Sequence, residues 1–236
     1  MSRLGAGTAP LVVVFHALDL EAARVRAPGW NELRCRPEEI RAPERPTVAW
    51  VRTGMGVEAA RKAVESIPDV PIEAAVCTGF AGALAHDLDA RMLVVADPLL
   101  DAEGATHATP LADALADAAH TANLGFTRGA LVTVPHVAET PDEKARLRTS
   151  LGALAVDMES AALASALAQR GIPAAAVRVV LDTAEEEIPG SLGALWRQPG
   201  LLISSVRIAA RMRPCARISA RLLEAWLARG LPATQR

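Results

Sequence analysis

The sequence has few aromatic residues, few cysteines, no excess of positive charge and no long hydrophobic run. Its 236 residues include three Phe, four Trp and no Tyr, so that aromatic residues make up 3% of the chain. Lys and Arg number 25 against 27 Asp and Glu, which gives a formal net charge of −2. Nucleic-acid binding relies on a basic surface for phosphates and often on aromatic side chains that stack on bases. We therefore predict that the protein does not bind nucleic acid.

No segment of the sequence is apolar over the roughly 20 residues that cross a bilayer. The best run, 10–18, is short and contains His16. It follows Arg3, as the apolar part of a signal peptide would, but a charged stretch begins at Asp19 and leaves no small-residue cleavage site. We interpret the run as the first strand of a mature cytoplasmic protein.

Cysteine is rare and scattered. The three residues form no CxxC pair and have no histidine at metal-ligand spacing: Cys35, Cys77 and Cys215. This pattern is typical of reduced thiols in the cytosol. We expect no metal site, and no motif indicates a cofactor.

Hydrophobic residues make up 51% of the chain and charged residues 22%, which is typical of a folded protein with a substantial core. Short β-branched runs alternate with alanine-rich amphipathic segments, and this alternation predicts an α/β fold with a largely parallel central sheet. The expected strands are 11–15, 47–51, 74–77, 92–96, 130–134 and 174–180, and the expected helices are 57–66, 111–122, 141–149 and 158–170. We predict one domain over 1–236, with a core at about 11–183 and a C-terminal helical extension at about 190–230.

The C-terminal segment is locally basic. Residues 200–236 contain seven Arg and one acidic residue, Glu224. At 100° per residue, Ile218, Leu222 and Trp226 share one face of a helix and the arginines lie on another. Two interpretations stay open. The apolar face packs on the domain while the arginines are solvated, or the helix makes a peripheral contact with a membrane that carries anionic headgroups.

Acidic residues stand at the ends of apolar runs, where open α/β sheets bind their ligands. Glu21 follows the first strand, Asp157 and Glu159 follow a short apolar run, and Asp182 ends the last strand. A carboxylate in such a position often caps the next helix instead, so each one alone is ambiguous.

Two glycine pairs also follow apolar runs. We expect a turn over 77–84 with Gly79 and Gly82, and a companion turn over 53–56, because glycine permits positive φ and close approach of the backbone to a ligand. Neither pair completes a GxGxxG or P-loop pattern.

The order of these features resembles the purine/uridine phosphorylase superfamily, especially its methylthioadenosine and S-adenosylhomocysteine nucleosidase branch. The most specific match is V-D-M-E-S at 156–160 followed by V-R-V-V-L-D at 177–182, which is similar to the family strings V-E-M-E and V-R-x-x-S-D. Asp157, together with D-E-K at 142–144 and Q-P-G-L at 198–201, most resembles the hopanoid-associated branch. Members of that branch are thought to remove adenine from adenosylhopane in bacterial hopanoid synthesis.

The resemblance implies a three-layer α/β sandwich with a mixed central sheet of the nucleoside phosphorylase type, assembled as a homodimer. It implies cleavage of the N-glycosidic bond of an adenine nucleoside, with lipid-linked adenosylhopane as the preferred substrate and no cofactor. Methylthioadenosine/S-adenosylhomocysteine nucleosidase, futalosine hydrolase and purine nucleoside phosphorylase are the alternatives within the enzyme class.

The same match implies a role for each acidic residue. Asp182 would protonate the departing adenine, which requires burial to keep its carboxyl protonated near neutral pH. Glu159 would bind the ribose hydroxyls and stabilise positive charge on the ring. Glu21 would position and deprotonate water, and Arg178 would support the strand end. The implied substrate contacts are Gly79, Phe80, Ala81, Val137, Asp157 and Met158.

Two positions favour hydrolysis over phosphorolysis. Bacterial purine phosphorylases that resemble this chain have arginine where Glu21 and Cys77 stand, and a carboxylate repels a phosphate dianion. Arg24 and Arg26 are the remaining candidates for a phosphate contact, so phosphorolysis stays an alternative.

Other positions depart from the family pattern. Leu181 replaces the family serine before the acid, so we expect Asp182 to lack the hydrogen bond that orients it. Phe80 makes the glycine segment more apolar, and Met92 replaces an acidic residue. A catalytically silent nucleoside-binding protein therefore stays open as a second class of function.

Overall fold

The computed structural model describes residues 9–188 and 199–230, without the side chains of 199–205. Its strands are β1 (Leu11–His16), β2 (Asn31–Cys35), β3 (Thr47–Arg52), β4 (Ala74–Ala83), β5 (Leu93–Leu100), β6 (Thr106–His107), β7 (Phe126–Thr133), β8 (Ala155–Asp157) and β9 (Ala174–Asp182). Its α-helices are α1 (Val57–Glu65), α2 (Ala112–Thr121), α3 (Pro141–Leu151), α4 (Ser160–Gln169) and α6 (Pro199–Ala228), and η1 (Asp19–Glu21) and η2 (Pro37–Glu39) are 3₁₀ turns.

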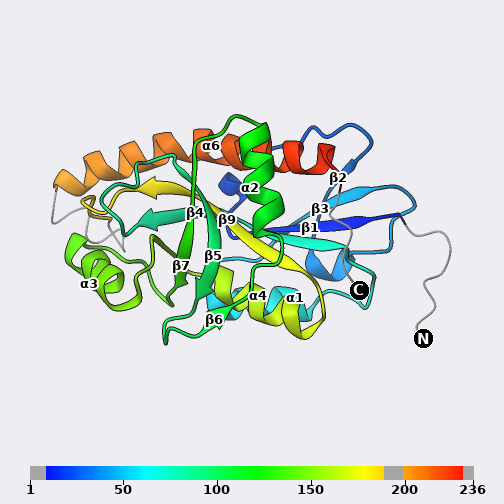
Figure 1. Cartoon of the computed structure of the whole chain (residues 1–236), viewed down its shortest axis with the longest axis horizontal. Coiled ribbons are helices and arrows are strands. Elements are labelled where there is room, and N and C mark those ends of the chain that lie inside the picture. The colour runs from blue at the N-terminus through cyan, green and yellow to red at the C-terminus, as the bar shows by residue number, and fades with distance from the viewer. Residues whose placement is uncertain (1–8, 189–198, 231–236) are drawn as a thin grey trace.

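The described strands form one mixed sheet between two layers of helices (Figure 1). Strands β2, β3, β1, β4 and β9 are parallel neighbours in that order. Beyond them, β5 runs antiparallel to β9, β7 is parallel to β5 and to β8, and β8 returns antiparallel to β4. The pairings of β4, β9, β5, β7 and β8 therefore close on themselves.

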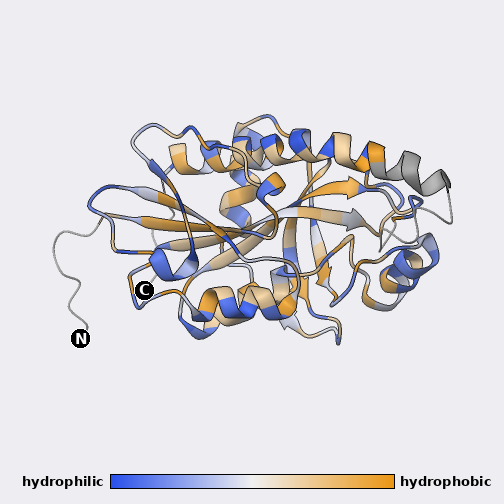
Figure 2. Cartoon of the chain, turned by 180° about the vertical axis from the view of Figure 1, so that it is seen from behind, coloured by the Kyte–Doolittle hydropathy of each residue, from blue (hydrophilic) through white to orange (hydrophobic). Residues whose placement is uncertain are grey.

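Both faces of the sheet are buried at its central strands, which explains the long apolar runs of β1 and of the first half of β4. Along β1, Val12 and Val14 pack in the cluster that includes α2 and α6, and Val13 and Phe15 pack in the cluster that includes α1 and α4. Figure 2 shows the strands coloured as mainly hydrophobic between the helices. This arrangement confirms the predicted three-layer α/β sandwich with a mixed central sheet.

The six expected strands and four expected helices are confirmed, but the pattern missed three short strands. β2, β6 and β8 have few apolar residues or only two or three residues in all, so they leave little periodic signal. The prediction of a glycine turn over 77–84 was wrong. Gly79 and Gly82 lie inside β4, which continues as a strand because β9 and β8 pair with it.

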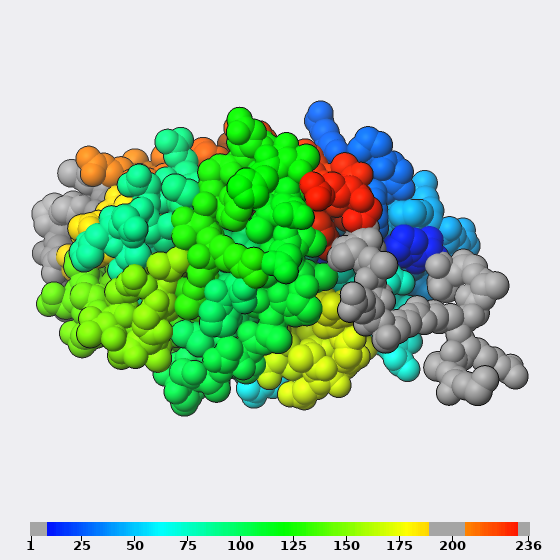
Figure 3. Space-filling view, viewed as in Figure 1, coloured from blue at the N-terminus to red at the C-terminus, as the bar shows by residue number. Residues whose placement is uncertain are grey.

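In the second half of the C-terminal helix, the apolar face packs on the domain, as the first interpretation predicts. Leu222, Leu223 and Trp226 are buried in the cluster of α2 and β1, while Arg217 and Arg221 are exposed. Figure 3 shows this part of α6, in red, beside residues of the N-terminal strands, in blue. No helix in the described ranges is both long and apolar enough to cross a membrane. The part of the predicted extension at 190–198, including Gln198, lies outside the described residues.

Candidate active site

Three buried carboxylates from distant parts of the chain line one cavity. Glu21 lies in η1, Glu159 immediately before α4 and Asp182 at the end of β9, and none is more than 6% exposed. The parallel strands β1, β4 and β9 end at the same edge of the sheet, which brings these segments together. Most other described residues of the wall are apolar, among them Leu18, Phe80, Val137, Leu181, Ile188 and Ile208.

Backbone N–H groups fix the Glu21 carboxylate. Its Oε2 accepts hydrogen bonds from the N–H groups of Ala17 at 2.7 Å and Leu18 at 2.9 Å. Its Oε1 accepts from the N–H of Phe80 at 3.2 Å, on β4. Both oxygens therefore act as acceptors at a set position on the cavity wall.

Two glycines of β4 make room for charged side chains. A Cβ on Gly79 would collide with the Arg178 guanidinium and lie 2.8 Å from Glu21 Oε1. A Cβ on Gly82, which pairs with Asp182 in the sheet, would lie 2.9 Å from Asp182 Oδ2. A Cβ at either position would occupy space that these charged side chains fill, which explains why both residues are glycine.

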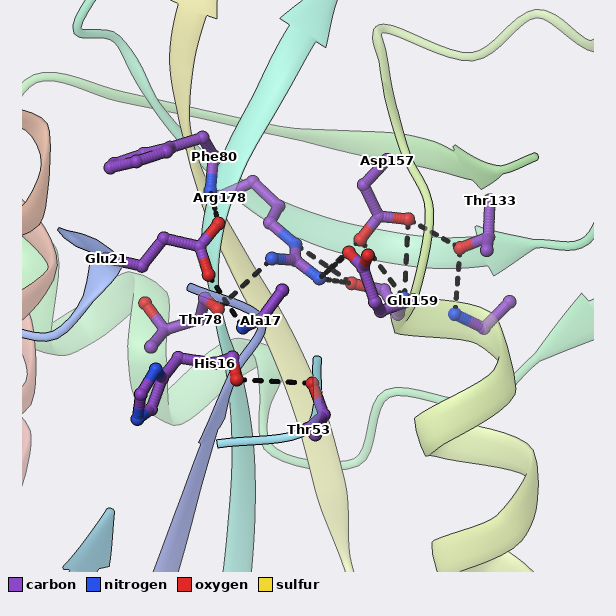
Figure 4. A network of polar contacts seen from close by, with 12 residues as sticks. His16, Ala17, Glu21, Thr53, Thr78, Phe80, Thr133, Asp157, Glu159 and Arg178 are labelled. Carbon is purple, nitrogen blue, oxygen red and sulfur yellow. Dashed lines mark hydrogen bonds and ion pairs between the residues drawn. The ribbon is translucent and has the colours of Figure 1, made fainter. Parts of the chain in front are cut away.

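The Arg178 guanidinium lies between the Glu21 and Glu159 side chains and binds groups of β4, β8 and α4 (Figure 4). It donates to the carbonyl oxygen of Thr78 at 3.1 Å and, through Nε and Nη2, to Ser160 Oγ at 3.1 and 2.9 Å. Its Nη2 also lies 2.5 Å from Asp157 Oδ2 and 3.6 Å from Glu159 Oε2. The predicted supporting position of Arg178 is confirmed, since the residue is 1% exposed and does not line the cavity.

Asp157 binds the first N–H of α4 and also lines the cavity. Its carboxylate accepts from the N–H of Ser160, at 3.1 Å on Oδ2, and from Thr133 Oγ1 at 2.6 Å. Thr133 Oγ1 in turn accepts from the N–H of Ala161 at 2.9 Å. Asp157 is therefore not the N-cap residue of α4, which is Glu159, but it accepts the first N–H of the helix from two residues farther back.

The Glu159 carboxylate is held by a backbone N–H at the start of α1. Its Oε1 accepts from the N–H of Gly56 at 2.8 Å, at the start of α1. Burial raises the pKa of Glu159, and the nearby Arg178 opposes that shift. The segment 53–56, expected as a companion turn, thus contributes Gly56 to Glu159 and Met55 to the cavity wall.

Asp182 combines burial with an ion pair. Desolvation raises the pKa of its carboxyl to about 6, and the ammonium of Lys144 opposes that shift. Lys144 Nζ donates to Asp182 Oδ2 at 2.7 Å. The expectation that Asp182 lacks an orienting hydrogen bond was therefore wrong, because Lys144 supplies one that Leu181 cannot.

A comparison with protein-family models finds the description "Phosphorylase superfamily" over residues 39–198, which is more than half of the chain. The chain belongs to this superfamily. A sequence search of the curated proteins gives no match.

Several solved structures share the fold of this chain at low sequence identity. Futalosine hydrolase of Helicobacter pylori is 17% identical with a TM-score of 0.71, over 94% of this chain and 98% of its own. The 5′-methylthioadenosine/S-adenosylhomocysteine nucleosidase of the same organism is 16% identical with a TM-score of 0.73, over 94% and 99%. S-adenosylhomocysteine nucleosidase of Streptococcus pyogenes is 21% identical with a TM-score of 0.70, over 97% and 100%.

Most residues singled out by their resemblance to the superfamily lie at the cavity. The three predicted catalytic carboxylates line it, as do Phe80, Ala81, Val137, Asp157 and Met158, whereas Gly79 lies behind Glu21 and is not part of the wall. Among the wall residues that the structure describes, His136 is the histidine. Its Nε2 lies 2.7 Å from Glu143 Oε1.

Sequence reasoning used Lys144 only as part of the D-E-K match at 142–144 and gave it no role, and it missed the apolar residues Ile188 and Ile208. A signal for the lysine existed, because the chain has only two lysines, at 62 and 144, among its 25 Lys and Arg. Ile188 and Ile208 gave none, since they reach the cavity through the path of the chain after β9 and not through a motif.

Proposed function

We propose that the protein hydrolyses the N-glycosidic bond of an adenine nucleoside and releases adenine. The observation that carries this proposal is the convergence of three buried carboxylates on one largely apolar cavity. Glycosidic bond cleavage builds positive charge on the sugar ring and needs an acid for the leaving group, and the cavity supplies anions and an acid of raised pKa.

Each carboxylate has a distinct part in the proposed reaction. Asp182 gives its proton to the purine as the bond between C1′ and the base nitrogen breaks and its electron pair moves onto the base. Glu159 binds the ribose hydroxyls and, with Glu21, stabilises the cationic ring. Water adds its oxygen to C1′ and passes a proton to Glu21, whose oxygens are held by backbone N–H groups.

The charges around the cavity support water as the nucleophile. Among the described residues of its wall there is no arginine or lysine. Arg24 and Arg26, the candidates for a phosphate contact, are exposed and are not part of the wall. A phosphate dianion would instead meet the Glu21 carboxylate, and like charges repel strongly where water is excluded.

The apolar wall supports a nucleoside with an apolar 5′ substituent, and we propose adenosylhopane as the preferred substrate. Leu18, Phe80, Leu181, Ile188 and Ile208 surround the carboxylates, and such a lining favours a lipid-like group over a charged one. The solved relatives include enzymes for methylthioadenosine, S-adenosylhomocysteine and futalosine by their names, so these nucleosides are the competitors to test.

Glu21→Gln tests the proposed mechanism. Loss of the base lowers kcat by about 100-fold or more, with KM changed much less, when adenine release is followed with and without phosphate. Asp19→Asn is the matched control, because Asp19 lies in the same 3₁₀ turn but pairs with Arg52 on the surface, and it keeps wild-type turnover. Equal kcat for wild type and Glu21→Gln would refute the role of Glu21. Nucleoside binding without turnover by the wild type would favour a silent binding protein.

We also propose that the protein is a homodimer. Met55 and Val137 line the cavity and are 62% and 37% exposed, so a second subunit at the mouth would cover apolar surface. Sedimentation is expected to give about twice the mass of 24.8 kDa. A fully active monomer would contradict this expectation.

Peripheral contact with a membrane is proposed for the exposed arginines of α6. Arg207, Arg213 and Arg217 lie on its outer surface, on the same helix as Ile208 of the cavity wall. Flotation with vesicles of anionic lipid is expected to recover the wild type and to lose a variant with these three arginines changed to serine. Recovery of both proteins in the aqueous fraction would contradict the contact.

A further inference from the structure

Lys144 is a buried lysine whose ammonium is surrounded by acceptors. Its Nζ lies 2.7 Å from Asp182 Oδ2, 2.7 Å from the carbonyl oxygen of Thr183 and 2.7 Å from that of Glu186. The side chain is 0% exposed. Three acceptors match the three N–H donors of an ammonium, so the charge is compensated by one carboxylate and two backbone dipoles.

The position of Lys144 in its helix is not explained by packing. Helix α3 is largely hydrophilic (Figure 2), and Lys144 is its one buried residue. A helix that needed only an anchor in the core would bury leucine or alanine there, since removing an ammonium from water costs several kcal/mol unless it is paired. The buried charge therefore points to a requirement of its partner, Asp182.

We propose that Lys144 is a positioning residue for the general acid, which holds the Asp182 carboxyl by Oδ2 and stabilises the carboxylate formed when the proton leaves. This inference rests on the proposed function. In the described part of the chain, every hydrogen bond of this carboxyl goes to Oδ2. Oδ1 is then the oxygen available to carry the proton toward the purine.

The reaction explains why a cation belongs at this place. When the bond at C1′ breaks, the proton moves from Asp182 to the purine and the carboxyl becomes an anion in a buried site. The ammonium, already 2.7 Å away, stabilises that anion without any rearrangement. Lys144 thus makes Asp182 a stronger acid at the moment of bond cleavage.

Other charged groups near Asp182 come from the following loop and from α6. Glu186 lies in that loop, and Arg211 of α6 binds its carboxylate at 2.6 and 2.9 Å and donates to the carbonyl oxygen of Leu181 at 3.0 Å. Glu186 raises the pKa of Asp182 and Arg211 lowers it. Both effects are smaller than those of burial and of Lys144. Arg211 and Lys144 hold the same loop, but only Lys144 touches the acid.

Lys144→Met separates the electrostatic role from a structural one. Without the ammonium, the pKa of Asp182 rises, so the alkaline limb of kcat/KM moves up by about one pH unit or more while kcat falls about ten-fold or more. Lys144→Gln keeps a hydrogen-bond donor but no charge, and we expect it to move the alkaline limb of kcat/KM in the same direction. This variant replaces Lys144→Met in the test if the Met variant does not fold.

Two controls match these variants. Lys62→Met removes the other lysine, which is exposed on α1, and leaves kcat and the pH profile unchanged. The double variant Arg211→Met with Glu186→Gln removes the ion pair that ties the same loop and keeps the net charge near Asp182, so it lowers stability without moving the alkaline limb. An unmoved limb in both Lys144 variants, or an equal shift in the loop variant, would overturn the inference.

A titration without turnover keeps this test separate from the proposed function. The carboxyl resonance of Asp182 is assigned by NMR from its absence in Asp182→Asn, and its pKa is compared between wild type and Lys144→Met. A higher pKa in Lys144→Met supports the coupling, and equal values refute it. If Asp182→Asn releases adenine at the wild-type rate, the proposed function fails whatever the titration shows.

Discussion

At the level of single residues, the most informative one is Asp182, because burial raises the pKa of its carboxyl and the Lys144 ammonium opposes that shift only in part. A carboxyl in water is ionised at neutral pH, whereas desolvation raises the pKa of Asp182 to about 6 although Lys144 lies beside it. In the proposed reaction, this shift leaves a larger fraction of Asp182 protonated near neutral pH than an exposed aspartate would have, and the ammonium of Lys144 stabilises the anion after proton transfer.

The raised pKa of Asp182 predicts a pH dependence of stability. Between the unfolded value of 3.8 and the folded value of about 6, the native state binds more protons than the unfolded state, so the free energy of unfolding falls as pH rises through this window. The shift corresponds to about 3 kcal/mol in all. We therefore expect the free energy of unfolding, measured in urea at pH 4 and pH 7, to fall less between these two pH values in Asp182→Asn than in the wild type. A decline of equal size in both proteins would contradict the shift.

At the scale of elements, β4 is the strand on which the site depends. It pairs with β1, β9 and β8, and its glycines lie where Arg178, Glu21 and Asp182 approach its backbone. Side chains at these positions would occupy the space of the charged groups.

Gly79→Ala tests this close approach. The new Cβ would displace the guanidinium of Arg178 and the carboxylate of Glu21, so we expect a loss of about 2–4 kcal/mol in urea unfolding together with a large loss of adenine release. Gly171→Ala is the control, because Gly171 also has positive φ, at 68°, but a Cβ there meets nothing within 4 Å. It should cost about 1 kcal/mol and leave turnover unchanged. Similar losses in both variants would show that only backbone strain matters at Gly79.

The long elements and the carboxylates could be predicted from the sequence because their signals are local. Strand β1 begins with five apolar residues in a row, and α3 begins at Pro141 behind the capping residue Thr140, signals that stand in the sequence itself. The course of β4 through Gly79 and Gly82 could not be predicted, since glycine is a poor strand residue and pairing with β9 decides the matter. The contact between Lys144 and Asp182 joins two segments that no spacing relates, so it appears only in the folded chain.

At the scale of the whole molecule, α6 connects the end of the chain to its beginning. Leu222 and Trp226 pack in the same cluster as Val12 of β1, and Glu224 accepts a hydrogen bond from the N–H of Arg26 at 2.6 Å. The C-terminal helix is thus part of the core that supports the site, and Arg211 ties it to the loop after Asp182.

This packing supports the prediction that the chain is one domain. In urea, tryptophan fluorescence and far-ultraviolet circular dichroism are expected to change in a single coincident transition, because Trp50 and Trp226 are buried in one cluster with strands and helices. A separate early loss of helical signal would show instead that α6 unfolds by itself.

Adenine release by the purified protein tests the proposal that buried carboxylates hydrolyse an adenine nucleoside. Adenosylhopane and methylthioadenosine are supplied with and without phosphate, and the sugar product is identified by mass spectrometry. We expect free adenine and an unphosphorylated sugar from the wild type, at a rate that phosphate does not change. We also expect adenosylhopane to be the faster substrate and Asp182→Asn to lose at least 100-fold in rate. A phosphorylated sugar that forms only with phosphate, or wild-type release by Asp182→Asn, would contradict the proposal.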